Sequence, residues 1–262
     1  MNSKGNLGFC LKIASTAAEK AGHYLMKQFR NDAIQVHRKN DETWVTEADI
    51  KSEKIILEHL KKETPDFTVL AEESSSAYSL TRGYKWIIDP LDGTPNYARG
   101  IPLFSVSIGL EMNGEIILGV LYLPSENLLL SAVKGHGAYA GKRRLSVSRR
   151  LLKDSILASE TYFNRADVGI LYRFVGKTRE VRIFNSACTV LAYLALGRID
   201  GCIDRVDKPW DWAAGSLIVR EAGGKVTNFK GQRVDLYQPS YVAANSLNHK
   251  EIVQVLSKKR SV

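Results

Sequence analysis

Apolar residues recur every three or four positions along the first part of the chain, a period that is typical of a helix. Leu11, Ala14 and Leu25 follow this period, so we expect an amphipathic helix over residues 7–30. The polar and irregular residues 31–45 predict a mobile loop after it.

The pattern beyond the loop predicts a helix and then strands. We expect the helix to begin at Thr46 and to end before Pro65, and the apolar residues 68–71 to form a short strand. Between residues 104 and 147, short apolar runs are separated by turn residues, which predicts strands that pair with antiparallel neighbours. These strands are 105–111, 116–123 and 128–133.

The pattern changes again after about residue 150, where helical and strand periods mix. We expect a helix over residues 188–197, a strand over residues 201–204, and a helix over residues 211–221 that glycines close. No linker composition separates the two parts of the chain. The chain therefore divides into halves, residues 1–150 and 151–262, of one compact unit.

Composition places the chain among ordinary globular proteins. Of its 262 residues, 44% are hydrophobic and 25% are charged, enough for a substantial core. No run approaches the roughly 18 apolar residues of a membrane helix, and the first residues lack the apolar core of a signal peptide. We therefore expect a cytoplasmic protein without a membrane partner, in which Cys10, Cys188 and Cys202 are buried free thiols.

The net charge of +9 raises the question of a nucleic-acid partner. The basic clusters at residues 142–144, 149–150 and 258–260 are short and lie in expected turns or near the end of the chain. No recognition motif accompanies them. We therefore expect no specific nucleic-acid binding, and a positive field that attracts anionic substrates.

The candidate chemistry begins where an apolar run stops at Asp89. Residues 86–88 predict a buried strand, and Asp89-Pro90-Leu91-Asp92 suits a type I turn, which favours an acidic residue first and proline second. Such a turn brings its first and fourth Cα atoms within about 7 Å of each other. Because two carboxylates this close repel unless a cation lies between them, we expect a divalent-metal site at the end of this strand.

An anion site is expected directly after the metal site. Thr94 suits the N-cap of a helix, and Pro95 suits its first position. The free N–H groups and partial positive charge of a helix start attract phosphate. A metal site beside a phosphate site favours hydrolysis of a phosphate ester.

Four short motifs, taken in order, resemble those of the inositol monophosphatase family of magnesium-dependent, lithium-sensitive phosphatases. Residues 89–94 resemble its Asp-Pro-x-Asp-Gly-Thr signature, and residues 71–74 resemble its Gly-Glu-Glu-Ser motif, with Ala71 in place of glycine. Residues 45–49 and 210–224 resemble its early Val-Thr-x-x-Asp element and its carboxy-terminal signature. The motifs span nearly the whole chain, which makes the resemblance specific.

The resemblance implies a fold, a reaction and an assembly. The implied fold is a layered αβαβα sandwich of the α+β or α/β class, with a large antiparallel sheet and a smaller mixed sheet. The implied reaction is hydrolysis of a small-molecule phosphate monoester, a sugar or polyol phosphate, by metal-activated water. The family is commonly dimeric, so the resemblance also implies a homodimer.

The resemblance implies two to three Mg²⁺ ions in each active site, and most of their ligands lie in the amino-terminal half. Carboxylate and carbonyl oxygens are the ligands that magnesium prefers. The implied ligands are Glu72, Asp89, the carbonyl of Leu91, Asp92 and Asp211. Arg38 or Lys39 either closes over a third ion or is a solvated charge of the loop.

The resemblance assigns the positioning of the attacking water to Glu72, Thr94 and Asp49, with Asp49 hydrogen-bonded to Thr94. The sequence of residues 46–49 has the form of a capping box as well, which would make Asp49 a structural residue. Asp211 likewise suits the N-cap of the helix that follows it. Both interpretations stay open for each aspartate.

Substrate contacts are implied at the helix start and in the carboxy-terminal half. The backbone N–H groups of Gly93 and Thr94 would hold phosphate, and Asp204 would bind a ring hydroxyl. Asn185 stands where the family has glycine. The full implied set is Asp92, Gly93, Thr94, Ser186, Ala187, Asp204, Arg205 and Asp211.

Three functions are compatible with these residues. The first is a phosphatase for myo-inositol 1-phosphate. The second is a fructose-1,6-bisphosphatase or a dual enzyme, because Arg205 beside the short Asp204 suits a second phosphate; a surface arginine is the structural alternative. The third is a non-catalytic, basic, nucleic-acid-associated protein, although such a protein has no need of clustered carboxylates.

Overall fold

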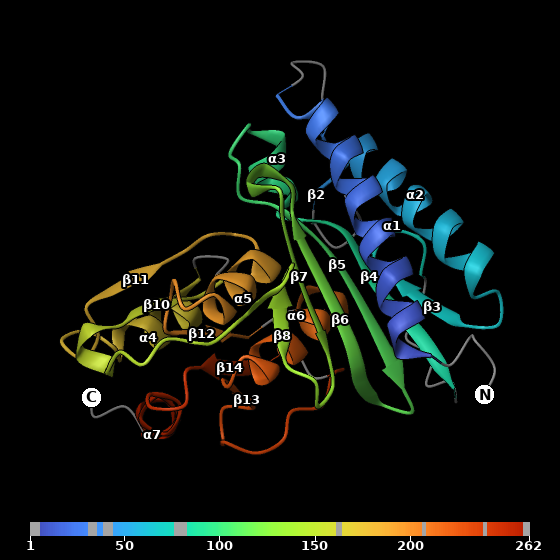
Figure 1. The fold of residues 1–262 in the computed structure, drawn as a ribbon. Helices are drawn as coiled ribbons and strands as arrows, with labels where there is room; N and C mark the ends of the chain where they lie inside the picture. The colour runs from blue at the N-terminus through green and yellow to red at the C-terminus, as the bar shows by residue number, and fades with distance from the viewer. Residues whose placement is uncertain are drawn as a thin grey trace.

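The elements stack in five layers, helix, sheet, helix, sheet and helix (Figure 1). The computed structural model describes residues 6–30, 36–38, 44–75, 83–160, 164–205, 208–237 and 240–258. The expected αβαβα sandwich is confirmed, with one larger and one smaller sheet.

Two long helices form the first layer, α1 (Leu7–Gln28) and α2 (Glu47–Glu63). Both pack on one face of the larger sheet (Figure 1). Ala14, Ala18 and Ala21 of α1 are fully buried, and such small side chains let a helix approach a sheet closely. The helical period expected at the start of the chain is therefore confirmed.

The larger sheet has seven strands in sequence order, and its central strands are antiparallel hairpins, as expected. The edge strand β3 differs, because it runs parallel to β4. The strands are β3 (Thr68–Ala71), β4 (Tyr84–Asp92), β5 (Ser105–Met112), β6 (Glu115–Leu123), β7 (Leu128–Val133), β8 (Ala138–Ala140) and β9 (Arg143–Arg144).

The smaller sheet is mixed, as expected. Its order is β11-β10-β12-β14-β13, in which β10 is parallel to both its neighbours and β14 is antiparallel to both of its own. The strands are β10 (Ile156–Ala158), β11 (Glu180–Arg182), β12 (Gly201–Asp204), β13 (Lys225–Thr227) and β14 (Tyr241–Ala244).

Two helices fill the layer between the sheets, α5 (Ala187–Ala195) and α6 (Pro209–Glu221). The helix α6 lies so close to β6 that a Cβ at Gly119 would come within 2.6 Å of the Ala214 carbonyl oxygen. Only glycine allows this approach. The helices α4 (Arg165–Tyr172) and α7 (His249–Ser257) form the last layer, over the outer face of the smaller sheet (Figure 1).

Two of the expected elements differ in the structure. Part of the expected loop over residues 31–45 is a small antiparallel pair, β1 (Val36–Arg38) and β2 (Trp44–Thr46), while Lys39 lies outside the described residues. The helix α6 begins at Pro209 rather than at residue 211, because proline is readily accepted in the first turn.

The structure tests the expectation on the cysteines. Cys10, Cys188 and Cys202 are buried and free, as expected. Of the helices in the described ranges, none is both long enough and apolar enough to cross a membrane.

Candidate metal and phosphate site

Asp89 and Asp92 lie at an irregularity near the end of β4. The expected type I turn is wrong, because β4 continues through Asp92. Asp89 pairs with Ser107 and Asp92 with Ser105, so β4 contains one residue more than β5 between the two pairs. Residues three apart on a regular strand point to opposite faces, and the extra residue of this bulge brings both carboxylates to one side.

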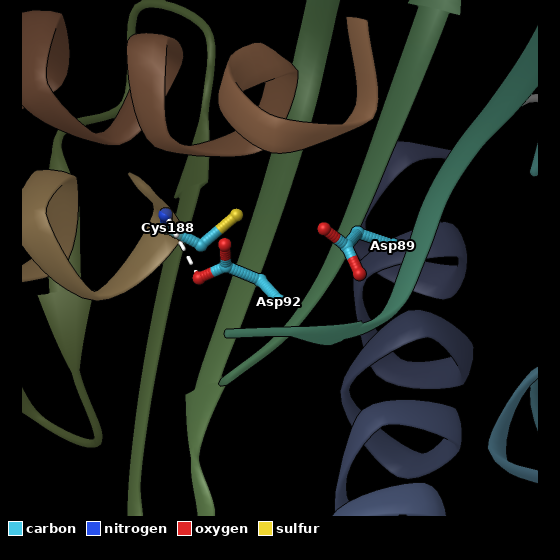
Figure 2. A group of neighbouring side chains, drawn as sticks. All are labelled: Asp89, Asp92 and Cys188. Atoms are coloured by element: carbon cyan, nitrogen blue, oxygen red, sulfur yellow. Dashed lines mark hydrogen bonds between the residues drawn. The ribbon is translucent and has the colours of Figure 1, made fainter. Parts of the chain in front are cut away.

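The carboxylate of Asp92 points toward Cys188, and the carboxylate of Asp89 lies across from this pair (Figure 2). All three side chains are buried, and one ligand atom of each lies within 4.8 Å of the other two. The Oδ1 atom of Asp89 accepts the N–H of Leu91 at 3.0 Å. The bulge and this bond therefore fix Asp89 before any ligand arrives.

Asp92 is held in place from α5 and β5. Its Oδ2 atom accepts the backbone N–H of Cys188 at 3.0 Å and the hydroxyl of Ser105 at 2.9 Å. The hydroxyl of Ser186 bonds to the same oxygen. Three donors on one oxygen fix the orientation of the carboxylate.

Glu72 and Asp211 add two further carboxylates from other elements. Glu72 follows β3 directly and lies beside Asp89, because Ala71 pairs with Ile88 in the parallel ladder. Asp211 lies in the first turn of α6, where its carboxylate accepts the N–H of Lys208 at 2.6 Å. Asp211 therefore contributes to the helix cap through the N-cap backbone, although Lys208 and not Asp211 is the N-cap residue.

The charges of these groups act on one another. Burial first, and then the negative charges of Glu72, Asp92 and Asp211, raise the pKa of Asp89 well above its ordinary value. Burial also raises the pKa of Asp92, against the lowering effect of its hydrogen bonds. Clustered buried carboxylates of this kind are stabilised by divalent cations.

The donor set fits magnesium better than a softer metal. Burial first, and then the charges of Asp92 and Asp89, raise the pKa of the Cys188 thiol well above its ordinary value. Its sulfur lies 2.9 Å from the carbonyl oxygen of Asp211, to which the thiol donates its proton. A protonated thiol is a poor metal ligand, which leaves the carboxylate oxygens as donors.

Asp49 takes part in both of the arrangements that the sequence left open. Its Oδ2 atom accepts the backbone N–H of Thr46 at 2.7 Å and the Thr46 hydroxyl at 2.6 Å, which completes a capping box at the start of α2. Its Oδ1 atom accepts the hydroxyl of Thr94 at 2.7 Å. One buried carboxylate thus connects a helix cap to the residue expected to position water.

The residue that caps the short helix α3 (Thr94–Ala98) is Gly93, so the expectation of Thr94 as N-cap is wrong. Gly93 has φ +88°, and a Cβ there would lie 2.8 Å from the Leu103 carbonyl oxygen, so both backbone and space require glycine. Thr94 is the first helical residue, and its hydroxyl reaches Asp49 and the carbonyl of Leu91 instead. The first N–H groups of a helix still lack helical partners.

The residues expected to contact substrate lie on two elements beside this cluster. Ser186 and Ala187 are at the start of α5, preceded by Asn185 at φ +52°, a left-handed conformation that asparagine tolerates in place of glycine. Asp204 ends β12 and accepts the N–H of Glu160 at 2.7 Å. Burial first, and then the charge of Glu160, raise the pKa of Asp204 well above its ordinary value.

The two arginines named from the sequence are Arg205, which forms an ion pair with an aspartate, and Arg38, which is exposed. The Nη1 atom of Arg205 lies 2.9 Å from Oδ1 of Asp167 on α4, and Asp167 is nearly buried. This ion pair supports the structural alternative for Arg205, and its role toward a second phosphate stays a prediction. Arg38 is exposed on β1, and its role over a third ion also stays a prediction.

Three residues that support this site were not expected from the sequence. Ser105 and Cys188 orient Asp92, and Glu160 lies against Asp204. Each is separated from its partner by more than ten positions along the chain, and none belongs to a motif. No local pattern could have indicated them.

The comparisons with known proteins agree on one family. The chain matches the model of the inositol monophosphatase family over residues 7–261. It is 38% identical to a protein of Pasteurella multocida named Nus factor SuhB, over 93% of this chain and 94% of that protein. It is 37% identical to an inositol-1-monophosphatase of Mesorhizobium japonicum, over 96% of this chain and 97% of that protein.

Solved structures resemble this fold closely. The extragenic suppressor protein suhB from Bartonella henselae superposes with a TM-score of 0.90 at 36% identity, covering 96% of this chain and 99% of that one. An inositol monophosphatase (IMPase) of Thermotoga maritima superposes with a TM-score of 0.85 at 35% identity, covering 95% of this chain and 96% of that one.

Proposed function

The chain belongs to the inositol monophosphatase family, and from this premise we propose that it is a magnesium-dependent phosphatase for a sugar or polyol monophosphate such as myo-inositol 1-phosphate. The observation that carries the proposal is the convergence of carboxylates at Asp89, where the charges of Glu72, Asp92 and Asp211 all act. A purely structural role does not explain this concentration of buried negative charge.

The proposed metal ligands are those four carboxylates and the Leu91 carbonyl, which would hold two to three Mg²⁺ ions. Bound magnesium would act as a Lewis acid on the phosphoryl oxygens and lower the pKa of the attacking water. The protein contributes fixed ligands: the bulge sets Asp89, and three donors set Asp92.

Thr94 and Asp49 have the geometry to position the attacking water. Because the Thr94 hydroxyl donates to Asp49, its oxygen lone pairs are available to accept a hydrogen bond from water. Asp49 is itself held by Thr46, so the Thr94 hydroxyl has a fixed orientation. Glu72 would act on the same water from the end of β3.

The phosphate and the ring would be held by different residues beside the carboxylates. The N–H groups of Gly93 and Thr94 would bind the phosphate at the start of α3. Ser186, Ala187 and Asp204 would contact the ring, with Asp204 accepting a hydroxyl proton. Asp92 and Asp211 would contact both the metal and the substrate.

Replacing Thr94 by valine should lower kcat about a hundredfold and leave KM nearly unchanged, because the hydroxyl is lost while the volume is kept. Thr94→Ser, which keeps the hydroxyl, is the matched control and should stay within about tenfold of wild type. Steady-state phosphate release measures both variants. Wild-type kcat in Thr94→Val would remove Thr94 from the positioning of water.

The substrate is tested by phosphate release from myo-inositol 1-phosphate, fructose 1,6-bisphosphate and 3′-phosphoadenosine 5′-phosphate. We expect the highest kcat/KM for inositol 1-phosphate. A clear preference for either of the other two would contradict the proposed substrate while keeping the proposed chemistry.

Arg205→Gln should change kcat/KM for inositol 1-phosphate and for fructose 1,6-bisphosphate by the same factor, because Asp167 already neutralises this arginine. Arg149→Gln, at another exposed arginine, is the control for the loss of one charge. A loss for the bisphosphate that is larger by about tenfold or more would favour the bisphosphatase alternative.

A second candidate function is that of a Nus factor, because relatives 38–39% identical carry that name. The net charge of +9 is compatible with a nucleic-acid-associated role. Salt-sensitive binding of DNA or RNA oligomers by a protein that releases no phosphate from any substrate would favour this candidate over the phosphatase.

The assembly and location belong to the same proposal. We infer a homodimer, which is common in the family, and a cytoplasmic location.

A further inference from the structure

A pocket of about 390 Å³ lies along α6, and this volume is within the range of small-molecule sites. Its walls come from the β5–β6 turn and the start of β6, from the end of β7, from α6, and from β13 with the segment that follows it. Trp212, Ser216 and Arg220 line it and are spaced by four residues, so they share one face of the helix.

The pocket is separate from the proposed active site. Asp211, in the first turn of α6, and Arg220, in its last turn, are separated by about 13 Å along the helix axis at 1.5 Å per residue. None of the proposed metal or substrate residues lines the pocket. A ligand bound there would not contact the reacting phosphate.

Positive charge dominates the pocket wall. Lys134, Arg220 and Arg233 line it, whereas Glu115 is its one acidic lining residue. Lys134 already pairs with Glu115 at 2.6 Å. Within the described chain, no carboxylate is in ion-pair contact with Arg220 or Arg233.

The two arginines are close enough to repel each other. Desolvation first, and then the charge of Arg233, lower the pKa of the Arg220 guanidinium. The hydrogen bond from Lys134 lowers the pKa of Glu115 most, and the same two guanidinium groups lower it further. Like charges gathered on a concave surface are stabilised by an anion between them.

The lining also includes apolar side chains and one residue with an unused donor. Leu217, Val226 and Val234 contribute buried aliphatic side chains. Trp212 is 1% exposed, and in the described chain its indole N–H has no hydrogen-bond partner. A buried donor without a partner is costly, and an acceptor on a ligand or water would remove that cost.

We propose that this pocket binds a small organic anion, whose carboxylate, sulfonate or phosphate group pairs with Arg220 and Arg233 and whose apolar body lies on Leu217, Val226 and Val234. Guanidinium groups bind such oxyanions through charge-assisted hydrogen bonds. These aliphatic side chains exclude water from the body of the ligand. This site is independent of the proposed phosphatase activity.

The test is isothermal titration calorimetry with naphthalene-1-sulfonate, an aromatic anion that a phosphatase cannot hydrolyse. The full chain is used after metal removal on a chelating resin, because the acidic active site then repels anions. We expect saturable binding of one molecule per chain. Absence of saturable binding to the wild-type protein would overturn the proposal.

The double variant Arg220→Gln/Arg233→Gln locates the site. We expect its Kd to rise about tenfold or more, because two charge-assisted contacts are lost. The matched control is Lys61→Gln/Lys62→Gln, which removes two exposed charges from α2 on the opposite face of the larger sheet and should change Kd by less than about twofold. A change below about threefold in the arginine variant, with an unchanged thermal midpoint, would place the anion elsewhere and overturn the proposal.

Discussion

Asp89→Asn should lower the rate of phosphate release roughly a thousandfold or more while the protein stays folded. The expectation rests on the position of Asp89 at the centre of the cluster, where the charges of Glu72, Asp92 and Asp211 all reach it. An amide keeps the shape and the bond from the Leu91 N–H, but it lacks the charge that holds a divalent cation. Steady-state kinetics at saturating magnesium measures the loss.

The same substitution should stabilise the metal-free protein. The pKa of Asp89 is raised by burial and by like charges, so at pH values above its ordinary pKa of 3.8 this carboxyl group opposes folding of the metal-free protein. Asparagine removes that opposition. Chemical denaturation after metal removal should therefore give a higher free energy of unfolding for Asp89→Asn than for the wild type.

Asp154→Asn is the control, because Asp154 is an exposed aspartate in a surface turn. It should leave the rate of phosphate release near that of the wild type, and the free energy of unfolding within about 0.5 kcal/mol of the wild-type value. Near-normal turnover in Asp89→Asn would remove this residue from the metal site. Lower activity together with lower metal-free stability would indicate a structural role instead.

Magnesium should raise the thermal unfolding midpoint of the metal-depleted protein by roughly 5–10 °C at a concentration near 100 times its Kd. Binding to the folded state alone stabilises it by mass action, by about 2.7 kcal/mol at that concentration. Differential scanning fluorimetry with and without magnesium measures the shift. Phosphate release should stop when the metal is chelated and return when magnesium is restored.

The rise in the unfolding midpoint that magnesium causes should be larger at about pH 8 than at about pH 5. The direction of this pH dependence follows from the raised pKa values of the carboxylates. The folded-state pKa values of Asp89 and Asp92 are raised above the ordinary value of 3.8. The folded metal-free protein therefore binds more protons than the unfolded chain, and its stability falls as the pH rises from about 4 through the raised pKa values. Magnesium relieves this loss where the carboxylates are ionised.

The controls separate this linkage from general salt effects. Potassium chloride at the same ionic strength should give little shift, and Asp89→Asn should lose most of the magnesium effect. An equal shift in wild type and Asp89→Asn would show that the ion binds elsewhere. A larger shift at the lower pH would contradict the assignment of the raised pKa values.

Much of the architecture was predictable because its determinants are local. The helix period of Leu11, Ala14 and Leu25, and the apolar runs of the hairpin strands β5 and β6, depend on residues that are neighbours in sequence. The αβαβα fold followed from the family motifs rather than from any period. The parallel edge strand β3 was not expected, since no local pattern distinguishes the direction of an edge pairing.

The functional residues were predictable as a set, but not their geometry. Asp89, Asp92 and Glu72 stand in motifs, whereas the expected turn is a bulge in β4 and the expected cap Thr94 binds Asp49 instead. A bulge depends on the register with β5, and the sequence of β4 does not contain that register.

The motifs identify the family, and they contain the acidic and glycine residues of the site, while short apolar runs indicate the strands. The contacts between distant residues appear only in the folded chain: Ser105 and Cys188 orient Asp92, Asp167 holds Arg205, and Arg220 and Arg233 line one pocket. These two kinds of determinant act over different ranges: periodicity and turn chemistry act over a few residues, whereas the orientation and ionisation of a buried side chain depend on groups that folding brings from distant parts of the chain.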